Sequence, residues 1–589
     1  MTLSTLFEGP LHMVVLNGIA SVVLLSCYFI YTRMYPKKSI SFDNILFGIS
    51  LLPLLSILRV GSYESGDLSL HTSFALPFYD AIREGNFIPV WNQYIVQGYG
   101  YPLYLFQYQL PYYLSSLLHF FEFSMITSLK IVLAVSYILS GQAIFHWIKR
   151  EFASEKGAFV AGLFYLFAPY HLVDMHFRVA IGESVAFALL PLSFLTVRRL
   201  YENPTMRRSI TAAVVFGLFI LSHQAISLLS FLLLGLYGIT LTWRSQKRKI
   251  FLFYSCFSVT LGIMGTSYYW APILIESRFT YLLSANTIEF LQPLQLLYSP
   301  WRAGLLFQGH YGELSFLIGY AQILVVLLSI FLLLKQIMHK RDRVGIFMVL
   351  GLFFFTCFMM LSYSKHIWSA IPVLRGFQFS YRLLLFVAFL TSILATYIVR
   401  YIKHTIFVGI LCIIVVGTTI LNWGNRRMLS YVTDDYIRAT MMSSLDKVGP
   451  GKTIWVDTDT LPKKEKHIEI LSGEATIKDQ NRKATMHKYL ITVSSDQARF
   501  VDYTLYFPSW IVLVNNSVYP FTYSDETAPG RIVWTLPKGE FEVVVELRDT
   551  LVRTYTKRLS LFIAGMMVIG FITPQKLSKA HQSGKIKKK

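Results

Sequence analysis

The sequence contains few cysteines and few charged residues. Four cysteines occur among 589 residues, and Cys27, Cys256, Cys357 and Cys412 are each embedded in an apolar run. No disulfide framework or zinc site is predicted from these four cysteines. Charged residues make up 15% of the chain, whereas hydrophobic residues make up 54% and aromatic residues 16%. This composition excludes a set of ordinary soluble domains and indicates a membrane protein.

Nucleotide-binding motifs are also missing. The segment "GPGKT" at 449–453 ends as a phosphate-binding loop does, but Asp446 stands where that motif needs a glycine. The net charge of +21 does not indicate nucleic acid, because the basic residues fall in alternate connections between apolar runs. No nucleic-acid partner is predicted.

Apolar runs recur along the whole chain. A hydrocarbon core about 30 Å thick needs roughly 20 mostly apolar residues per helix. About 13 such runs predict a polytopic, mainly α-helical membrane bundle. They cover 11–32, 42–60, 127–147, 157–171, 181–197, 210–222, 225–243, 251–272, 314–334, 344–362, 381–399, 404–422 and 558–573.

The positions of the basic residues predict the orientation. Lys and Arg gather in every second connection, at 33–38, 149–156, 198–208, 244–249, 335–343 and 400–403. The positive-inside rule places these connections and the lysine-rich tail in the cytoplasm, and it places the N-terminus outside. The first run is interpreted as a retained helix rather than a signal peptide, since the basic "RMYPKK" follows it. The prediction is a multi-pass protein of the cell membrane.

Three substantial pieces are then expected outside, at 61–126, 273–313 and 424–557. The third is polar, and "HKYLITVSS", "FVDYTLYF", "WIVLVNN" and "EFEVVVEL" are typical of strands. It predicts an extracytoplasmic β-sandwich near the C-terminus. The expected domains are an additional N-terminal helix at 1–41, a membrane domain at 42–423, the β-rich domain at 424–557, and a last helix with a basic tail at 558–589.

The first outer loop carries ionisable residues in the stretch "YESGDLSLHTSFALPFYD". Apolar residues of 71–84 are spaced for a helix lying on the membrane interface. Asp67 precedes this helix and His71 lies one turn further on. A loop of this kind can present a carboxylate to a lipid headgroup, although Asp67 could instead cap the helix.

Further ionisable residues collect at the outer boundary of the later runs. In "YHLVDMHFRVAIGES", Arg178 and Glu183 are expected either to form a salt bridge between two helices or to bind a phosphate through Arg178. His223 lies at a tight outer turn. Arg278 and Arg382 stand near the outer ends of two other runs, where arginines either reach lipid headgroups or bind substrate.

Several segments in order resemble a known family. They include "GDLSLH", "IPVWNQYIVQGYGYPLYLFQYQLPYYLSSLLH", "YLFAPYHLVDMHFRVAIGESVAFALLPL" and "GFQFSYRLL". From about residue 43 to 400 the chain resembles the membrane proteins called 6-pyruvoyl-tetrahydropterin synthase-related, which are similar to polytopic GT-C glycosyltransferases. The chain adds one helix before the first family helix. It has no His-x-His zinc cluster, so no pterin chemistry is predicted.

The resemblance implies transfer of a sugar from a polyprenyl-phosphate donor to a glycan, lipid or protein acceptor at the outer face. An acidic residue in the first outer loop acts in such enzymes at the acceptor or at a metal, and Asp67 matches that position. Asp67 is therefore expected as the catalytic base, with His71, Arg178, Glu183, His223, Arg278 and Arg382 at the substrate. A divalent metal ion is left open, with Asp67 and His71 as its candidate ligands.

A second function class stays open. The chain could be a non-catalytic membrane protein, either a transporter or flippase of lipid-linked glycans or an envelope scaffold. Transporters place ionisable residues near the membrane midplane and break their helices there. The polar residues of this sequence gather instead at the ends of the runs, which favours headgroup chemistry.

Overall fold

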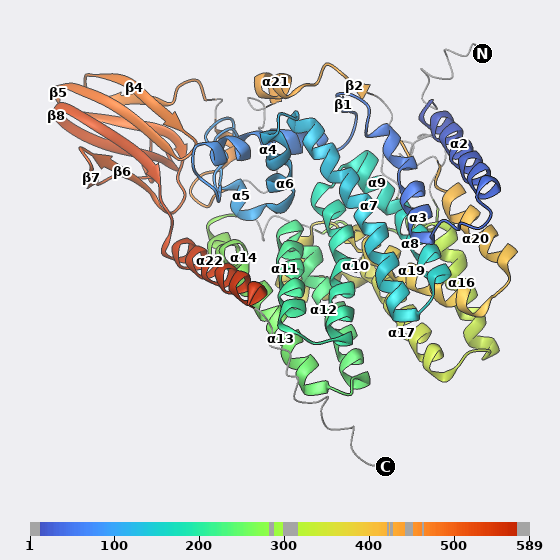
Figure 1. Cartoon of the computed structure of the whole chain (residues 1–589). Helices are drawn as coiled ribbons and strands as arrows, with labels where there is room; N and C mark the ends of the chain where they lie inside the picture. Colours follow the sequence, from blue (N-terminus) through green and yellow to red (C-terminus); the bar gives the residue numbers. More distant parts are fainter. Residues whose placement is uncertain are drawn as a thin grey trace, which may run out of the picture.

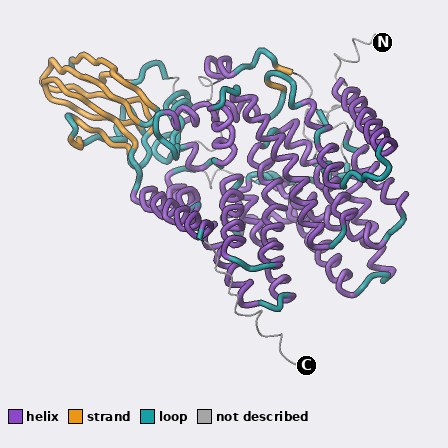
Figure 2. The backbone as a smooth tube through the Cα atoms, in the orientation of Figure 1, coloured by secondary structure: helices purple, strands orange, loops and turns teal. Residues whose placement is uncertain are grey.

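The computed structural model describes residues 12–281, 288–298, 316–420, 423–424, 428–441, 452–461 and 464–573. The predicted basic tail at 576–589 lies outside the described residues. A bundle of helices makes up most of the molecule, and a six-stranded sheet projects from one side of it (Figure 1, Figure 2).

Seven helices in the described ranges are long and apolar enough to cross a membrane. They are α2 (His12–Met34), α7 (Met125–Phe152), α10 (Ile181–Glu202), α12 (Gln224–Arg244), α17 (Lys340–Met360), α19 (Leu384–Tyr401) and α22 (Leu551–Ile572). Two bent pairs raise the number to nine if each pair is one span. These are α8 (Glu155–Leu166) with the segment Pro169–Arg178, which includes α9 (Pro169–Val173), and α13 (Arg248–Gly265) with α14 (Ser267–Glu276).

The remaining predicted runs form shorter helices. These are α3 (Phe42–Ser50), α11 (Met206–Ser222), α16 (Tyr320–Lys335) and α20 (Thr405–Gly417). Every predicted run thus overlaps a helix, but thirteen complete spans are not confirmed. Proline explains two of the breaks, because its ring blocks the helical hydrogen bond to the preceding turn. Pro53 lies in a 3₁₀ turn after α3, and Pro169 begins α9 after a 49° bend.

The first outer loop folds into α4 (Leu68–Arg83), α5 (Leu103–Phe106) and α6 (Leu110–Phe120). The predicted helix α4 is present, and other protein segments bury much of its surface.

A segment after α20 fastens this loop. Its strand β2 (Met428–Leu429) pairs with β1 (Ser62–Tyr63), and its short helix α21 (Asp434–Tyr436) follows. The Asp434 carboxylate accepts hydrogen bonds from the first two backbone N–H groups of α7, where the helix dipole favours negative charge. Arg438 forms a bidentate ion pair with Asp80 on α4.

The C-terminal sheet is antiparallel, with strand order β3-β5-β8-β6-β7 and β4 on the remaining part of β5. The strands are β3 (Ile468–Ser472), β4 (Ala475–Lys483), β5 (Met486–Leu505), β6 (Trp510–Val514), β7 (Ser517–Tyr519) and β8 (Arg531–Leu547). Hydrogen bonds join all six into one sheet, so a β-sandwich is not confirmed. The two stretches "HKYLITVSS" and "FVDYTLYF" both belong to the long strand β5.

The sheet domain docks on the first outer loop through aromatic residues. Trp91 meets Trp510 edge to face at 5.3 Å between ring centroids. The Leu505 N–H donates a 3.1 Å hydrogen bond to the carbonyl of Tyr99. Gly100 has a φ of +86°, and a Cβ there would lie 2.4 Å from Nε1 of Trp91. Only glycine therefore lets the loop turn against this tryptophan.

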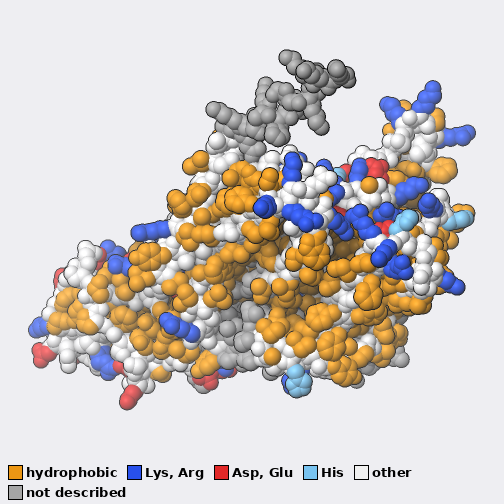
Figure 3. Space-filling model, turned by 90° about the horizontal axis from the view of Figure 1, so that it is seen from below, with side chains coloured by type: hydrophobic (Ala, Val, Ile, Leu, Met, Phe, Trp, Pro, Cys, Tyr) orange, Lys and Arg blue, Asp and Glu red, His pale blue; other side chains and the backbone are white. Residues whose placement is uncertain are grey.

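The two ends of the bundle differ. Helices α4 and α6 lie at one end, and the connections α12–α13 and α16–α17, which carry predicted cytoplasmic charges, lie at the other (Figure 1). Figure 3 views the molecule from the latter end. It shows extensive hydrophobic surface, with many Lys and Arg side chains gathered over one part of the view. The separation fits the predicted topology, while the orientation of the termini stays a prediction.

Candidate functional site

Asp67 is held at the start of α4 by its backbone. Its N–H donates a 2.8 Å hydrogen bond to the carbonyl of Arg178, and the N–H of Gly66 donates to the carbonyl of Phe177. The Asp67 carboxylate is partly exposed and makes no hydrogen bond or ion pair with a described residue. The hydroxyl of Ser65 instead accepts from the Leu68 N–H at the helix start. The alternative that the Asp67 side chain caps the helix is therefore wrong.

His71 is buried one turn further along α4, between two tyrosines. Its Nδ1 lies 2.9 Å from the hydroxyl of Tyr112, and its Nε2 lies 3.3 Å from that of Tyr108. Burial lowers the pKa of His71, and the negative charge of Asp67 only partly opposes this effect. The hydrogen bonds to the two tyrosines fix the orientation of the ring.

Tyr108 joins this part of the loop to the membrane helices. Its ring stacks on that of His223, the residue that caps the start of α12, with 5.6 Å between centroids. The charges of Asp67, Arg382 and Glu183 all act on its hydroxyl. Tyr108 therefore lies between the free carboxylate of the loop and the ionic groups beneath it.

Those ionic groups form a buried cluster. Arg178 donates to Oδ1 of Asp174 at 2.6 Å and to Oε1 of Glu183 at 3.1 Å. The same Glu183 oxygen accepts Nε of Arg382 at 2.9 Å, and its other oxygen accepts the hydroxyl of Tyr170 at 2.5 Å. The expected salt bridge between Arg178 and Glu183 is confirmed. Two cations face two carboxylates, which limits the cost of burying charge.

The two arginines of this cluster differ in accessibility. The Arg178 side chain is 7% exposed and lies between two carboxylates. The Arg382 side chain is 13% exposed, and its Nη1 donates to the carbonyl of Phe377. Its Nη2 makes no hydrogen bond with the part of the chain that the structure describes. Arg382 is thus the more available of the two for an anion.

The structure brings together six of the seven residues selected from the sequence. These are Asp67, His71, Arg178, Glu183, His223 and Arg382. Arg278 lies apart: it is exposed, with its guanidinium 4.7 Å from the ring centroid of Phe279.

Sequence reasoning missed Tyr108, Tyr112 and Tyr170, whose hydroxyls connect the site. In a chain that is 16% aromatic, nothing in the pattern distinguishes these tyrosines from core residues. The one available signal was the density of tyrosines in "YLFQYQLPYY".

The proposed metal ligands do not fit a divalent ion in this arrangement. Both ring nitrogens of His71 are engaged with tyrosines, and Asp67 alone supplies few of the oxygen ligands that Mg²⁺ or Ca²⁺ needs. Within the described ranges no group of three or more His, Cys, Asp or Glu side chains could hold a metal.

Comparisons with known proteins give a family and distant structural neighbours. Two cryo-EM structures of arabinofuranosyltransferase AftD from Mycobacteria are each 14% identical to the chain. One match covers 67% of this chain and 29% of that one, and the other covers 66% and 27%, both with a TM-score of 0.38. The chain therefore spans less than a third of the length of these structures. No curated protein matches it.

A family model extends over the membrane helices. The 6-pyruvoyl-tetrahydropterin synthase related domain, described as a membrane protein, matches residues 106–424. This range includes Arg178, Glu183, His223 and Arg382, and it covers more than half of the sequence. The chain belongs to the 6-pyruvoyl-tetrahydropterin synthase related family of membrane proteins.

Proposed function

We propose that the chain is an integral-membrane glycosyltransferase. It transfers a sugar from a polyprenyl-phosphate donor to a glycan, lipid or protein acceptor on the extracytoplasmic side. One observation carries the proposal: the Asp67 carboxylate, which is partly exposed and has no partner among the described residues, is tied by its backbone to Arg178, a member of the buried ionic cluster. A carboxylate that can accept a proton, on a backbone held by a member of a cationic cluster, supports the assignment of a base and of a phosphate-binding group to this site.

The reaction needs a base and a stabiliser of the leaving group. Asp67 accepts the proton of the acceptor hydroxyl while the acceptor oxygen forms a bond to the anomeric carbon. The bond between that carbon and the phosphate oxygen breaks, and the polyprenyl phosphate leaves with the electron pair. The departing phosphate gains negative charge, which a nearby guanidinium stabilises.

The difference in exposure between Arg382 and Arg178 supports different proposed roles for the two arginines. Arg382 contacts the phosphate, because it is the more exposed and has an Nη2 without a partner among the described residues. Arg178 is a positioning residue: its carbonyl holds the Asp67 backbone, and its guanidinium holds Glu183. His71 and His223 shape the same site through Tyr108.

One observation favours the alternative hypothesis that the chain is a transporter of lipid-linked sugars. The bent pair of α8 and Pro169–Arg178 brings Asp174 and Arg178 next to a helix break, and broken helices with buried charges are typical of transporter binding sites. The polyprenyl-linked sugar would then be cargo rather than donor.

A transfer assay separates the two. Purified protein is incubated with membrane extract and a panel of radiolabelled polyprenyl-phosphate sugars, and label in the acceptor fraction is counted. We expect one donor to label an acceptor. If every donor fails, while protein in liposomes moves a polyprenyl-phosphate sugar across the bilayer, the chain is a transporter and the proposal is wrong.

A further inference from the structure

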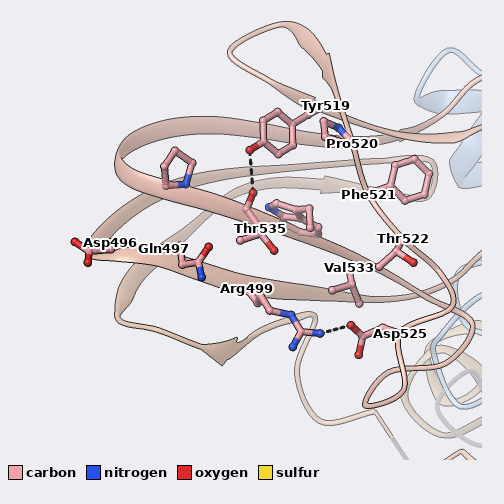
Figure 4. A pocket seen from close by; sticks show the side chains of 12 residues that line it. Asp496, Gln497, Arg499, Tyr519, Pro520, Phe521, Thr522, Asp525, Val533 and Thr535 are labelled. Carbon is pink, nitrogen blue, oxygen red and sulfur yellow. Dashed lines mark hydrogen bonds and ion pairs between the residues drawn. The ribbon is translucent and has the colours of Figure 1, made fainter.

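The sheet domain carries an open groove whose lining includes neither Asp67 nor any member of the buried ionic cluster. Its volume is about 620 Å³. Gln497 and Arg499 of β5 and Val533 and Thr535 of β8 line one side of it, and the chain from Tyr519 onwards lines the other (Figure 4). The strands β5 and β8 also carry the core of the domain, so the groove has a rigid floor.

The groove combines aromatic rings with planar polar groups. Tyr519 and Phe521 contribute the rings, and the Tyr519 hydroxyl is fixed by a 2.9 Å hydrogen bond to the carbonyl of Thr535. Asp496 and Gln497 are exposed neighbours at one end (Figure 4). Their side chains make no hydrogen bond with a described residue, so a carboxylate and an amide are free for a ligand.

The charges of the groove disfavour an anion. Arg499 is its sole cationic lining residue, and it is already ion-paired with Asp525. Asp525 is fixed in turn, since its other oxygen accepts the backbone N–H of Thr527 at 2.9 Å. The carboxylate of Asp496 is left without a countercharge in the groove. A phosphate or an acidic peptide would therefore meet net negative charge.

The strands that form the floor of the groove also leave no backbone edge to which a peptide could add by hydrogen bonding. Gln497 pairs with Pro537 and Arg499 pairs with Thr535 across β5 and β8, so an extended peptide cannot add as a strand there. A sugar ring is complementary to the carboxylate, the amide and the aromatic rings of the groove. Its hydroxyls can form hydrogen bonds with the carboxylate and the amide, and its C–H face can pack on an aromatic ring. The groove is open to solvent, so a sugar chain that is longer than the groove can extend beyond it.

We propose that this groove binds a neutral glycan chain. The inference rests on the proposed function in one respect: the bound chain would be the glycan acceptor, held on the same side as Asp67. Binding itself requires neither donor nor Asp67, so it can be measured without turnover.

The test is binding of neutral oligosaccharides to the full-length protein in lipid nanodiscs. Nanodiscs avoid maltoside detergents, whose sugar headgroups would compete. The probes are maltohexaose, mannohexaose and xylohexaose, with a sialylated oligosaccharide and a proline-rich peptide as the competing ligand classes. We expect at least one neutral hexasaccharide to bind.

The variants locate the binding site. Gln497→Ala and Phe521→Ala should each weaken binding by about tenfold, the effect of losing one hydrogen bond or one ring contact. Gln480→Ala is the matched control, since Gln480 is an exposed glutamine on β4 outside the groove. Its affinity should equal that of wild type.

Three results overturn the inference: no neutral hexasaccharide binds, only the sialylated sugar or the peptide binds, or the groove variants bind like Gln480→Ala. Failure of the proposed function looks different. In that case the hexasaccharide binds and the groove variants weaken it, but no donor gives transfer.

Discussion

Nε of Arg382 donates a 2.9 Å hydrogen bond to Oε1 of Glu183, although 199 positions separate the two residues in the chain. The same oxygen accepts Nη2 of Arg178. One carboxylate oxygen therefore joins the start of α10 to the turn before α19 and to the segment that holds Asp67. Glu183 therefore holds together the chain segments that form the candidate site.

Removing the charge of Glu183 should destabilise the protein. Glu183→Gln keeps the shape of the side chain but leaves two buried guanidiniums facing Asp174 alone, which costs about 3–5 kcal/mol of unfolding free energy. The measurement is unfolding in detergent mixed with increasing SDS. Glu202→Gln, which breaks a more exposed pair with Arg150, should cost less than about 1 kcal/mol. Equal effects of the two variants would contradict the central place of Glu183.

The pair of Glu276 and Arg553 makes a second stability prediction. Both side chains are 2% exposed, and the pair fastens α22 to the end of α14. Arg553→Leu leaves a buried carboxylate whose partners are reduced to Thr550, at a cost of about 3–5 kcal/mol. Adding Glu276→Leu should recover most of that loss, because no buried charge then remains. The same SDS titration measures the unfolding free energy of both variants. A double variant as unstable as Arg553→Leu would refute the prediction that the loss comes from an unpaired buried carboxylate.

The joint between the sheet and the first outer loop should respond to pH. The Lys464 ammonium donates a 2.9 Å hydrogen bond to the carbonyl of Gly98. Burial first, and Arg482 second, lower the pKa of Lys464 to about 7, while Asp502 opposes them. Between about pH 7 and 10.5 the unfolded chain therefore holds a proton that the folded chain has released.

Stability should accordingly rise with pH across that window. Lys464→Met removes the titrating group and should flatten the rise, as measured by thermal unfolding from about pH 7 to 9. Lys478→Met, at an exposed position on β4, should keep it. An unchanged slope in Lys464→Met would show that another group is responsible.

Phosphate recognition should depend on the shape of the Arg382 side chain. Arg382→Lys retains the charge but cannot reach both Glu183 and a phosphate oxygen with a planar fork. We expect transfer to fall by about tenfold or more, roughly the value of one charge-assisted hydrogen bond. Arg278→Lys, at the exposed position outside the cluster, should transfer sugar at the wild-type rate. Equal rates for both variants would remove Arg382 from the site.

The sequence predicted the positions of the helices better than it predicted their lengths. Long apolar runs locate membrane helices because lipid requires them, and every run overlaps a helix. Hydrophobicity alone does not show where a run bends: the run at 157–171 contains Pro169, and the helix breaks there with a 49° bend. The sequence predicts separate strands at "HKYLITVSS" and "FVDYTLYF", whereas the residues between them form an irregularity in register within the single strand β5.

The candidate site was predicted from charged residues at the membrane boundary, where an unpaired charge costs free energy. Arg178, Glu183 and Arg382 stood out at the ends of apolar runs, and burial in a shared cluster explains why they are there. Tyr108 and Tyr170 gave no such signal, because tyrosine is common both in protein cores and at the membrane interface. Which arginine remains accessible could not be predicted either, since it depends on side-chain partners from distant segments.

The most direct test of the account compares Asp67→Asn with wild type and Glu64→Gln in the donor-panel assay. Glu64 is an exposed carboxylate three residues earlier in the same loop, so it controls for loss of charge there. We predict that Asp67→Asn lowers transfer by about 10²–10⁴-fold, as expected for loss of a general base, and that Glu64→Gln transfers normally. Transfer by Asp67→Asn at the wild-type rate would contradict the central claim.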